Sequence, residues 1–442
     1  MSLHHYITEI QKFKNWDKLN EKQQKFCLSV LSDKNVFISG SAGVGKTFCT
    51  NFILDFLEKK RVSVGKTAMT GIAALNLGGS TVHSFCGVGL CNTDFNDILK
   101  GVFRNKKAKQ RIMAVKVLFI DELSMCSGTV FNILNKVFKV IRKNGAPFGG
   151  IKVVVIADFL QLPPVMKDLQ SKDDLAFESD AWKECNFSPI ILTEIIRQKE
   201  DQEFSKILNE IRVGNIDNIE KIEERIGVKF DLPDGIRPVR LLGYNKAVDS
   251  WNKKCLDSIN AKTYTFWAKD RGEDRHIDFF DRNCSSPAKL ELKIGCQVML
   301  TYNIDTESGL VNGLVGKIMG FEEKCVVVKF VNGLKEIIEP QKWEIKEQVV
   351  ENDEIKFKPI ASRTQIPLRL AFSSSYHRAQ GSTLDYVEID LDQVFTEGMA
   401  YMGLSRVKSL KGLSVIKSFN PYKIQVNKKC LDFYENLQQN TI

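Results

Sequence analysis

The sequence predicts an α/β protein built on a doubly wound parallel β-sheet, with a smaller β-rich insertion later in the chain. Apolar runs of strand length at 36–38, 115–120 and 151–157 alternate with segments of helical apolar spacing, as in a parallel sheet with crossover helices. Short alternating strands between 292 and 359, punctuated by Asn-Gly pairs, have the pattern of a small β-barrel. A chain of 442 residues, 43% of them apolar, has room for two or three domains.

The first apolar run leads into a glycine-rich segment that matches the phosphate-binding loop pattern in its required place between a strand and a helix. The glycines let backbone N–H groups turn toward phosphates, Lys46 can reach the β and γ oxygens, and the Thr47 hydroxyl can hold Mg²⁺. An ordinary glycine turn is the alternative, but apolar residues at helical spacing follow the loop and favour a nucleoside triphosphate site. The expected contacts come from Gly40, Ala42, Gly43, Val44, Gly45, Lys46 and Thr47.

Two adjacent carboxylates, Asp121 and Glu122, follow the second apolar run. In a parallel sheet this strand end would emerge beside the phosphate loop. We expect Asp121 to hold Mg²⁺, directly or through water, and Glu122 to orient and deprotonate the water that attacks the γ-phosphate. An acidic helix N-terminus is the alternative, and it explains one carboxylate more easily than two.

The third apolar run ends in a segment from Asp158 to Val165 that contains two prolines. Gln161 stands where a side chain can sense the γ-phosphate, and the prolines would stiffen the loop that carries it. A surface turn without function is the alternative.

Charge is unevenly distributed along the chain. The net charge is +9, and the segment 98–157 holds twelve Lys or Arg residues against two acids, Asp121 and Glu122. A basic segment of this kind suits a nucleic-acid backbone, and a solvated basic face without a partner is the alternative.

Other features indicate an intracellular protein, cytoplasmic or nuclear. No apolar run approaches the roughly 20 residues that cross a bilayer, and the N-terminal residues resemble neither a signal nor a transit peptide. The eleven cysteines contain no C-x-x-C pair, which favours reduced thiols. His83, Cys86 and Cys91 form the only cluster that resembles zinc ligands, but a clear fourth ligand is missing, so buried thiols are the favoured interpretation.

A series of segments, in order from about residue 19 to 407, resembles the petite integration frequency family of superfamily-one DNA helicases, within the RecD-like group. Ala157 stands where the family usually has glycine, and Arg378-Ala379 replaces the commoner Lys-Ser. Besides the phosphate loop, the matching segments are Leu19-Asn-Glu-Lys-Gln23, Thr67-Ala-Met-Thr70-Gly71-Ile-Ala-Ala74, Thr81-Val-His83-Ser84, Asp121-Glu-Leu-Ser-Met125, Pro147-Phe-Gly-Gly150, Asp158-Phe-Leu-Gln-Leu-Pro-Pro-Val165, Leu192-Thr-Glu-Ile-Ile-Arg197-Gln198, Leu292-Lys-Ile-Gly-Cys-Gln-Val-Met299, Leu310-Val-Asn-Gly313, His377-Arg-Ala-Gln380-Gly381-Ser-Thr383 and Tyr401-Met-Gly-Leu-Ser-Arg406.

The resemblance implies two RecA-like domains with an SH3-like β insertion in the second. The first domain would span 1–190, with a small strand-separating wedge at about 85–112, and the second would span 191–289 and 363–442 around an insertion at 290–362. The implied activity is an ATP-dependent helicase that moves 5′ to 3′ on single-stranded DNA, with ATP and Mg²⁺ as cofactors. Its partners would be single-stranded DNA and forked or tailed duplex, with no membrane, and it would act as a monomer.

The resemblance also assigns residues that spacing alone does not. Gln23 would read the adenine edge, while Arg197 and Arg406 would approach the γ-phosphate from the second domain, joined by Gln380. Structural ion pairs are the alternative for the arginines, and buried, hydrogen-bonded imidazoles are the alternative for the two histidines among the implied DNA contacts. Those DNA contacts are Thr70, Gly71, His83, Ser84, His377 and Thr383.

Two other functions remain open at this stage. An ATP-switched protein that binds or remodels single-stranded DNA with little unwinding would carry the same motifs. A small-molecule kinase would share the phosphate loop but would leave Arg197, Arg406 and the β insertion unexplained.

Overall fold

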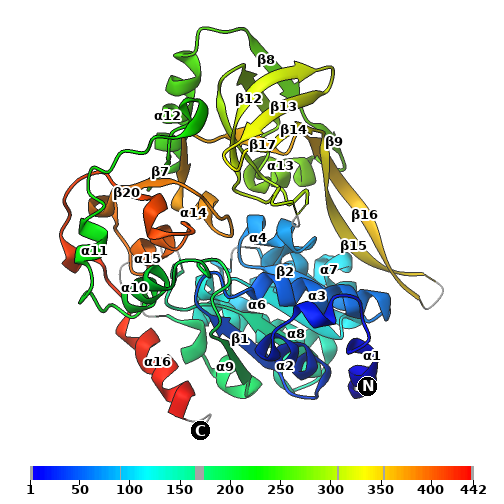
Figure 1. The fold of residues 1–442 in the computed structure, drawn as a ribbon. Helices are drawn as coiled ribbons and strands as arrows, with labels where there is room; N and C mark the ends of the chain where they lie inside the picture. Colours follow the sequence, from blue (N-terminus) through cyan, green and yellow to red (C-terminus); the bar gives the residue numbers. More distant parts are fainter. Residues whose placement is uncertain (1–2, 90, 165–173, 306–307, 352–353, 440–442) are drawn as a thin grey trace. The chain divides into compact units, whose positions relative to one another are not determined.

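The computed structural model describes residues 3–89, 91–164, 174–305, 308–351 and 354–439. The chain forms two compact units, drawn in Figure 1. The first comprises Met1–Glu194, Glu344–Ile360 and Leu437–Ile442, and the second comprises Ile195–Trp343 and Ala361–Asn436. The domain boundaries implied by the family resemblance stay a prediction. Val165, which ends one of the matching segments, lies outside the described residues.

The first unit contains a six-stranded sheet in the order β3-β2-β4-β5-β1-β6, with every neighbouring pair parallel. The sheet is well shielded, since all residues of β1 and nearly all of β4 and β5 are buried. Because the strands are parallel, the loops that carry the predicted site leave the same edge of the sheet. The strands are β1 (Val36–Gly40), β2 (Val64–Ala68), β3 (Ser80–Thr81), β4 (Val117–Asp121), β5 (Lys152–Ile156) and β6 (Ser188–Leu192).

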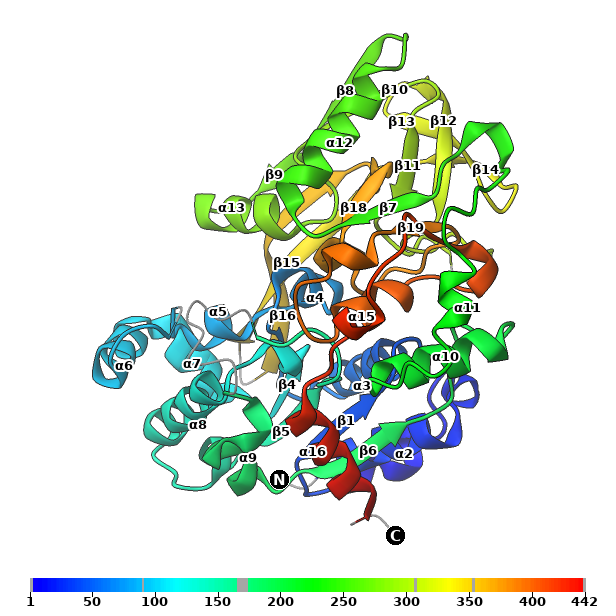
Figure 2. The same ribbon diagram turned by 90° about the vertical axis from the view of Figure 1, so that its left-hand side faces the viewer.

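Side-chain caps define where several helices of this unit begin. Asn20 and Gln23 form a capping box, and the hydroxyls of Thr70 and Ser127 accept N–H groups of the first turns of α4 and α8. Figure 2 shows α5, α6 and α7 as one group at the side of the sheet. The helices are α1 (Ile7–Ile10), α2 (Glu21–Leu31), α3 (Lys46–Lys59), α4 (Gly71–Asn76), α5 (Val82–Cys86), α6 (Phe95–Arg104), α7 (Lys106–Ala114), α8 (Gly128–Arg142) and α9 (Asp180–Cys185).

The second unit contains a four-stranded parallel sheet in the order β18-β7-β19-β20. Its strands are β7 (Val239–Leu242), β18 (Ser373–Ser375), β19 (Val387–Ile389) and β20 (Leu413–Val415). The helices of the unit are α10 (Gln202–Arg212), α11 (Glu220–Glu223), α12 (Asn245–Asp257), α13 (Asp274–Asn283), α14 (Tyr376–Ala379), α15 (Met399–Leu404) and α16 (Lys428–Gln439), whose last residues belong to the first unit.

An antiparallel β insertion interrupts this second α/β region. Five strands pair in the order β14-β13-β12-β11-β17 around an apolar core that includes Val298, Ile318 and Val328, and β12 and β13 lie side by side in yellow in Figure 1. A turn that contains one of the Asn-Gly pairs, Asn332-Gly333, joins β13 to β14, with Gly333 at a φ of 90°. The five strands are β11 (Gln297–Leu300), β12 (Val315–Glu322), β13 (Cys325–Phe330), β14 (Lys335–Ile338) and β17 (Leu368–Leu370). With two parallel α/β sheets and a β insertion, the predicted fold class is confirmed.

The remaining strands form two small sheets, β8 with β10 and β15 with β16 and β9. Buried Arg363 fastens β16 to its neighbours, because its guanidinium donates to both Asp270 oxygens at 2.9 and 2.6 Å and also pairs with Asp281. These strands are β8 (Thr263–Trp267), β9 (Lys269–Arg271), β10 (Lys289–Lys293), β15 (Gln341–Glu351) and β16 (Glu354–Gln365).

Two whole-chain properties complete the fold. Each of the eleven cysteines is a free thiol. None of the described helices combines the length and the apolar composition that a membrane crossing requires.

Candidate functional site

The phosphate loop runs from the end of β1 to the start of α3. Gly43 and Gly45 have φ values of 84° and 83°, in the left-handed region that glycine adopts without strain. Gly40 is needed for packing as well, because a Cβ there would lie 2.4 Å from the Leu192 carbonyl oxygen at the end of β6. Ala42 and Val44 are buried and Thr47 is exposed. The loop is therefore held by the sheet on one side while its helix-side residues reach the surface.

Lys46 lies folded against this loop. Its ammonium donates to the carbonyl oxygens of Gly40, at 2.7 Å, and Ser41, at 3.1 Å. Burial and Glu122 raise the pKa of Asp121, and the Lys46 charge offsets part of that rise, so Lys46 is within electrostatic reach of that carboxylate. Bound phosphate oxygens would compete with these carbonyl oxygens for its three N–H donors. The contact of Lys46 with the β- and γ-phosphates stays a prediction.

Asp121 is the last residue of β4, and β5 lies between β4 and β1 in the sheet. Loss of solvation and the neighbouring Glu122 charge raise the pKa of Asp121 to about 7, although its Oδ1 accepts the Glu122 N–H at 2.8 Å. Glu122 has a φ of 54° and is one of the few non-glycine residues in the left-handed region. That conformation costs about 1 kcal/mol and often marks a functional position.

These residues fit a magnesium ion held jointly with a nucleotide. Among the residues that the structure describes, no group of three or more His, Cys, Asp or Glu side chains could hold a metal ion unaided. Mg²⁺ in phosphoryl-transfer sites usually takes one or two protein oxygens, with phosphate and water completing the shell. Asp121 and Thr47 are oxygen donors of that kind, so a metal bound here would depend on the nucleotide.

Sequence reasoning gave no role to Asp158, which follows β5. It is 2% exposed, and its Oδ2 accepts the Gln161 side-chain amide at 2.8 Å while its Oδ1 accepts the Leu160 N–H at 3.3 Å. Asp158 therefore fixes the orientation of Gln161. A signal was available in the sequence, since Asp158 directly follows a buried strand at the same sheet edge as Asp121.

Gln23 has two internal partners. Its Oε1 accepts the Asn20 N–H at 3.1 Å and its Nε2 donates to the Val44 carbonyl at 3.2 Å, with the residue 1% exposed. The side chain thus connects the start of α2 to the phosphate loop. Its predicted contact with adenine stays a prediction.

The implied DNA contacts of the first unit lie at the starts of two short helices. Thr70 caps α4, Gly71 is buried, and Ser84 is exposed in the first turn of α5. His83 is partly buried, and burial lowers its pKa, which favours a neutral imidazole. These groups can donate or accept hydrogen bonds but carry little charge.

The basic segment 98–157 has several structural functions. Arg111 donates to the Ser84 and Phe85 carbonyls, and Arg142 donates to the Gly149 and Met113 carbonyls. Lys152 binds the carbonyls that end α2, and Lys139 pairs with Glu184. These four residues therefore have partners within the fold, and the contact of the basic segment with a nucleic acid stays a prediction.

In the second unit, Arg197 and Thr383 are in contact. The Arg197 Nε donates to the Thr383 hydroxyl at 3.0 Å, and its Nη1 donates to the Ser405 carbonyl at 2.9 Å. Burial and the neighbouring Arg406 lower the pKa of Arg197 to about 9. A residue implied at the γ-phosphate and a residue implied at the DNA thus share one hydrogen bond, which sequence spacing did not indicate.

Arg406 is 2% exposed at the end of α15. Its Nε donates to the Met402 carbonyl at 2.9 Å and its Nη2 to the Ser405 hydroxyl at 2.8 Å. Both of these acceptors are uncharged groups. Gln380 directly follows α14, and His377 within that helix has its pKa lowered by burial.

The chain is similar in sequence to known proteins. Residues 18–222 match the family model of the PIF1-like helicase, and residues 278–321 match that of the DNA helicase Pif1, 2B domain. The chain is 35% identical over 427 residues to the ATP-dependent DNA helicase PIF1 of Xenopus laevis, covering 96% of this chain and 65% of that protein. The chain spans less than two thirds of the length of the curated relatives that it matches.

Two solved structures extend the similarity. The crystal structure of Pif1 helicase from Candida albicans is 37% identical, with a TM-score of 0.73 over 95% of this chain and 99% of that one. The crystal structure of Pif1 helicase from Bacteroides in complex with ADP-AlF3 and ssDNA is 26% identical, with a TM-score of 0.62 over 96% and 97%.

Proposed function

Since this chain belongs to the PIF1-like helicase family, we propose that it is an ATP-dependent DNA helicase that moves 5′ to 3′ along single-stranded DNA and unwinds duplex. One observation carries the proposal. The phosphate loop, the Asp121-Glu122 pair and the Asp158-Gln161 pair all leave the carboxyl edge of one parallel sheet, where nucleotides bind in such folds.

In this proposal the site residues of the first unit act on the phosphates and on the attacking water. The loop amides and Lys46 would bind the β- and γ-phosphates, and Gln161, oriented by Asp158, would contact the γ-phosphate or the attacking water. Glu122 would accept a proton from that water. A Mg²⁺ ion held by Asp121, Thr47 and the phosphates would neutralise charge on the transferring phosphoryl group.

Arg197 and Arg406 would supply further positive charge to the γ-phosphate, with Gln380 beside them. Their guanidinium groups are held by hydroxyls and backbone carbonyls. These contacts orient the two guanidinium groups, and a guanidinium brought close to the γ-phosphate would stabilise the charge of the transition state.

We also propose DNA as the partner of this chain. The Bacteroides relative was crystallised with ssDNA, and the hydroxyl and imidazole groups of Thr70, Ser84, His83 and His377 suit sequence-independent contacts. Single-stranded DNA and forked or tailed duplex are the proposed substrates, and a monomer is the proposed working form.

The test is steady-state ATP hydrolysis with and without a single-stranded oligonucleotide over a salt series, with Lys46→Ala as the blank. We expect strong stimulation by the oligonucleotide that weakens as salt rises, and hydrolysis at least ~100-fold lower in Lys46→Ala and Glu122→Gln. A rate of ATP hydrolysis that the oligonucleotide does not change would refute the helicase proposal. A duplex with a single 5′ or 3′ tail then gives the polarity, and stimulated hydrolysis without unwinding would favour an ATP-switched DNA-binding protein.

A further inference from the structure

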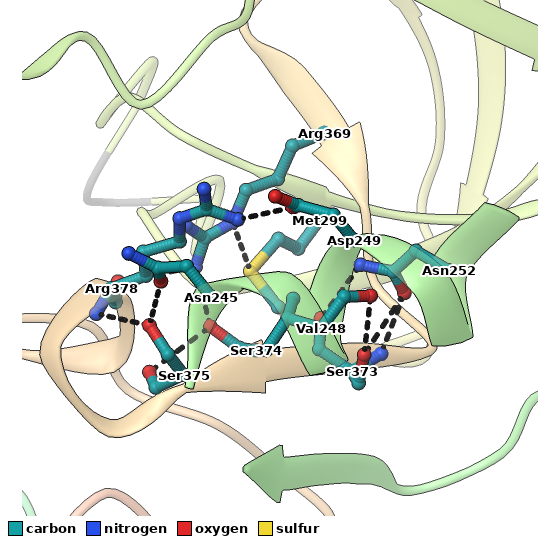
Figure 3. Close-up of polar contacts among 10 residues, drawn as sticks. All are labelled: Asn245, Val248, Asp249, Asn252, Met299, Arg369, Ser373, Ser374, Ser375 and Arg378. Atoms are coloured by element: carbon teal, nitrogen blue, oxygen red, sulfur yellow. Dashed lines mark hydrogen bonds and ion pairs between the residues drawn. The ribbon is translucent and has the colours of Figure 1, made fainter. Parts of the chain in front are cut away.

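Two arginines of the second unit lie next to each other, and most of the groups around them are uncharged (Figure 3). Arg369, on β17, donates to the Met299 sulfur, the Ser374 hydroxyl and the Arg378 carbonyl, each at 3.2 Å. Arg378, on α14, pairs with Asp249 at 2.7 Å. Among the described residues Asp249 is the one carboxylate paired with either arginine, so the cluster carries excess positive charge.

The positive charge of Arg369 is destabilised by its environment. Burial and the adjacent Arg378 charge lower the pKa of Arg369 to about 10. Neutral acceptors satisfy individual N–H groups, but they do not neutralise a guanidinium that has lost part of its water. An anion with several oxygens would both accept hydrogen bonds from the N–H groups and neutralise the positive charge, because guanidinium groups bind phosphate through paired N–H donors.

Buried, hydrogen-bonded serines surround the two arginines. Ser373, Ser374 and Ser375 are each at most 2% exposed. Ser373 exchanges hydrogen bonds with Asn252, and the Ser375 hydroxyl donates to Asn245 while it accepts the Arg378 N–H. These bonds tie β18 and α14 to α12, so the two guanidinium groups are presented by a fixed framework, as a binding site requires.

We propose that Arg369 and Arg378 form a phosphate-binding subsite that takes a backbone phosphodiester of single-stranded nucleic acid. The proposal rests on the proposed function, and His377, the implied DNA contact that precedes Arg378, favours a polynucleotide over a free phosphate. Asp249, which is 63% exposed, competes with the phosphate for Arg378. Arg369 lies outside every segment that sequence reasoning connected with DNA.

The experiment measures binding of a fluorescent single-stranded oligonucleotide by anisotropy over a salt series, using the full chain. Arg369→Gln should weaken binding about three- to tenfold and reduce the slope of log K against log salt by about 0.7, the value for one phosphate contact on a single strand. Arg369→Lys should restore most of the slope. Lys206→Gln, which removes an exposed charge on α10, should change neither quantity by much.

Asp249→Asn gives the opposite sign, because it frees Arg378 from its competitor. It should tighten binding a few-fold, whereas a merely structural ion pair would predict loss or no change. An unchanged salt slope in Arg369→Gln overturns the subsite, including when the variant is less stable to heat. Inorganic phosphate is tested as a competing ligand by its effect on stability to heat. If phosphate stabilises the wild type but not Arg369→Gln, and both proteins bind the oligonucleotide equally, the polynucleotide assignment is wrong.

These failures are separable from failure of the proposed function. If the wild type shows no DNA-stimulated ATP hydrolysis, the helicase proposal is wrong. If it does, and Arg369→Gln matches the wild type in affinity and salt slope, only the subsite is wrong.

Discussion

Replacing Asp121 by asparagine should stabilise the nucleotide-free protein while it abolishes ATP hydrolysis. Asp121 has its pKa raised from 3.8 to about 7 by loss of solvation and by Glu122, so its ionisation costs more in the folded than in the unfolded chain. The cost is absent below pH 3.8, grows as pH rises, and is complete above about pH 7. Asparagine keeps an oxygen that can accept the Glu122 N–H but carries no charge.

The magnitude follows from the pKa difference. Each pKa unit between the folded and unfolded states is worth about 1.4 kcal/mol, which sets an upper limit of about 4 kcal/mol above pH 7. Asp121 keeps some solvent exposure, so we expect about half of this. The advantage of Asp121→Asn over the wild type in free energy of unfolding should therefore grow by about 1–2 kcal/mol between about pH 5 and pH 8.

The assay is urea denaturation of both proteins at the two pH values, followed by the fluorescence of Trp16 and Trp182 in the first unit. Adding Mg²⁺ with ADP should reverse the order, because the carboxylate then gains a cation to bind. An Asp121→Asn advantage that is equal at both pH values, or a variant less stable at about pH 8, would refute the reasoning.

Three further predictions concern the second unit. Arg363→Ala should destabilise it by about 3–5 kcal/mol, because two carboxylates lose a fully buried partner. Arg275 on α13 is 62% exposed, so the control variant Arg275→Ala should cost under about 1 kcal/mol. Chemical denaturation measures both losses. Gly313→Ala should cost about 2–3 kcal/mol, since φ is 98° and the new Cβ would lie 2.4 Å from the Thr383 carbonyl oxygen. Gly381→Ala, with φ 78° and open space, should cost about 1 kcal/mol, and equal losses would contradict the steric argument. Thr383→Val removes the acceptor of Arg197 Nε, so stimulation of ATP hydrolysis by DNA should fall several-fold while hydrolysis without DNA is nearly unchanged; an unaltered stimulation ratio would contradict a link between the two residues.

The sequence by itself determined the local elements of the first unit. The run at 36–38, the loop to Thr47 and the helical spacing after it correspond to β1, the phosphate loop and α3. Asp121 lies at the end of β4, as its apolar run predicted. These features depend on neighbours within a few residues, and periodicity with glycine placement encodes such neighbours directly.

The tertiary structure alone decided how these elements are combined. It placed β5 between β4 and β1, gave Asp158 the task of orienting Gln161, and connected Gln23 to the phosphate loop. It also joined the side chains of Arg111, Arg142 and Lys152 to backbone carbonyls, which are contacts that composition does not reveal.

The same limit applies to the second unit. Arg197 meets Thr383 and Arg369 meets Arg378 only because β17, β18 and the segments after them fold against distant parts of the chain. Contacts of this kind depend on strand order and on which rotamers the packing allows. Local sequence patterns carry neither kind of information, so they located the motifs but did not pair their side chains.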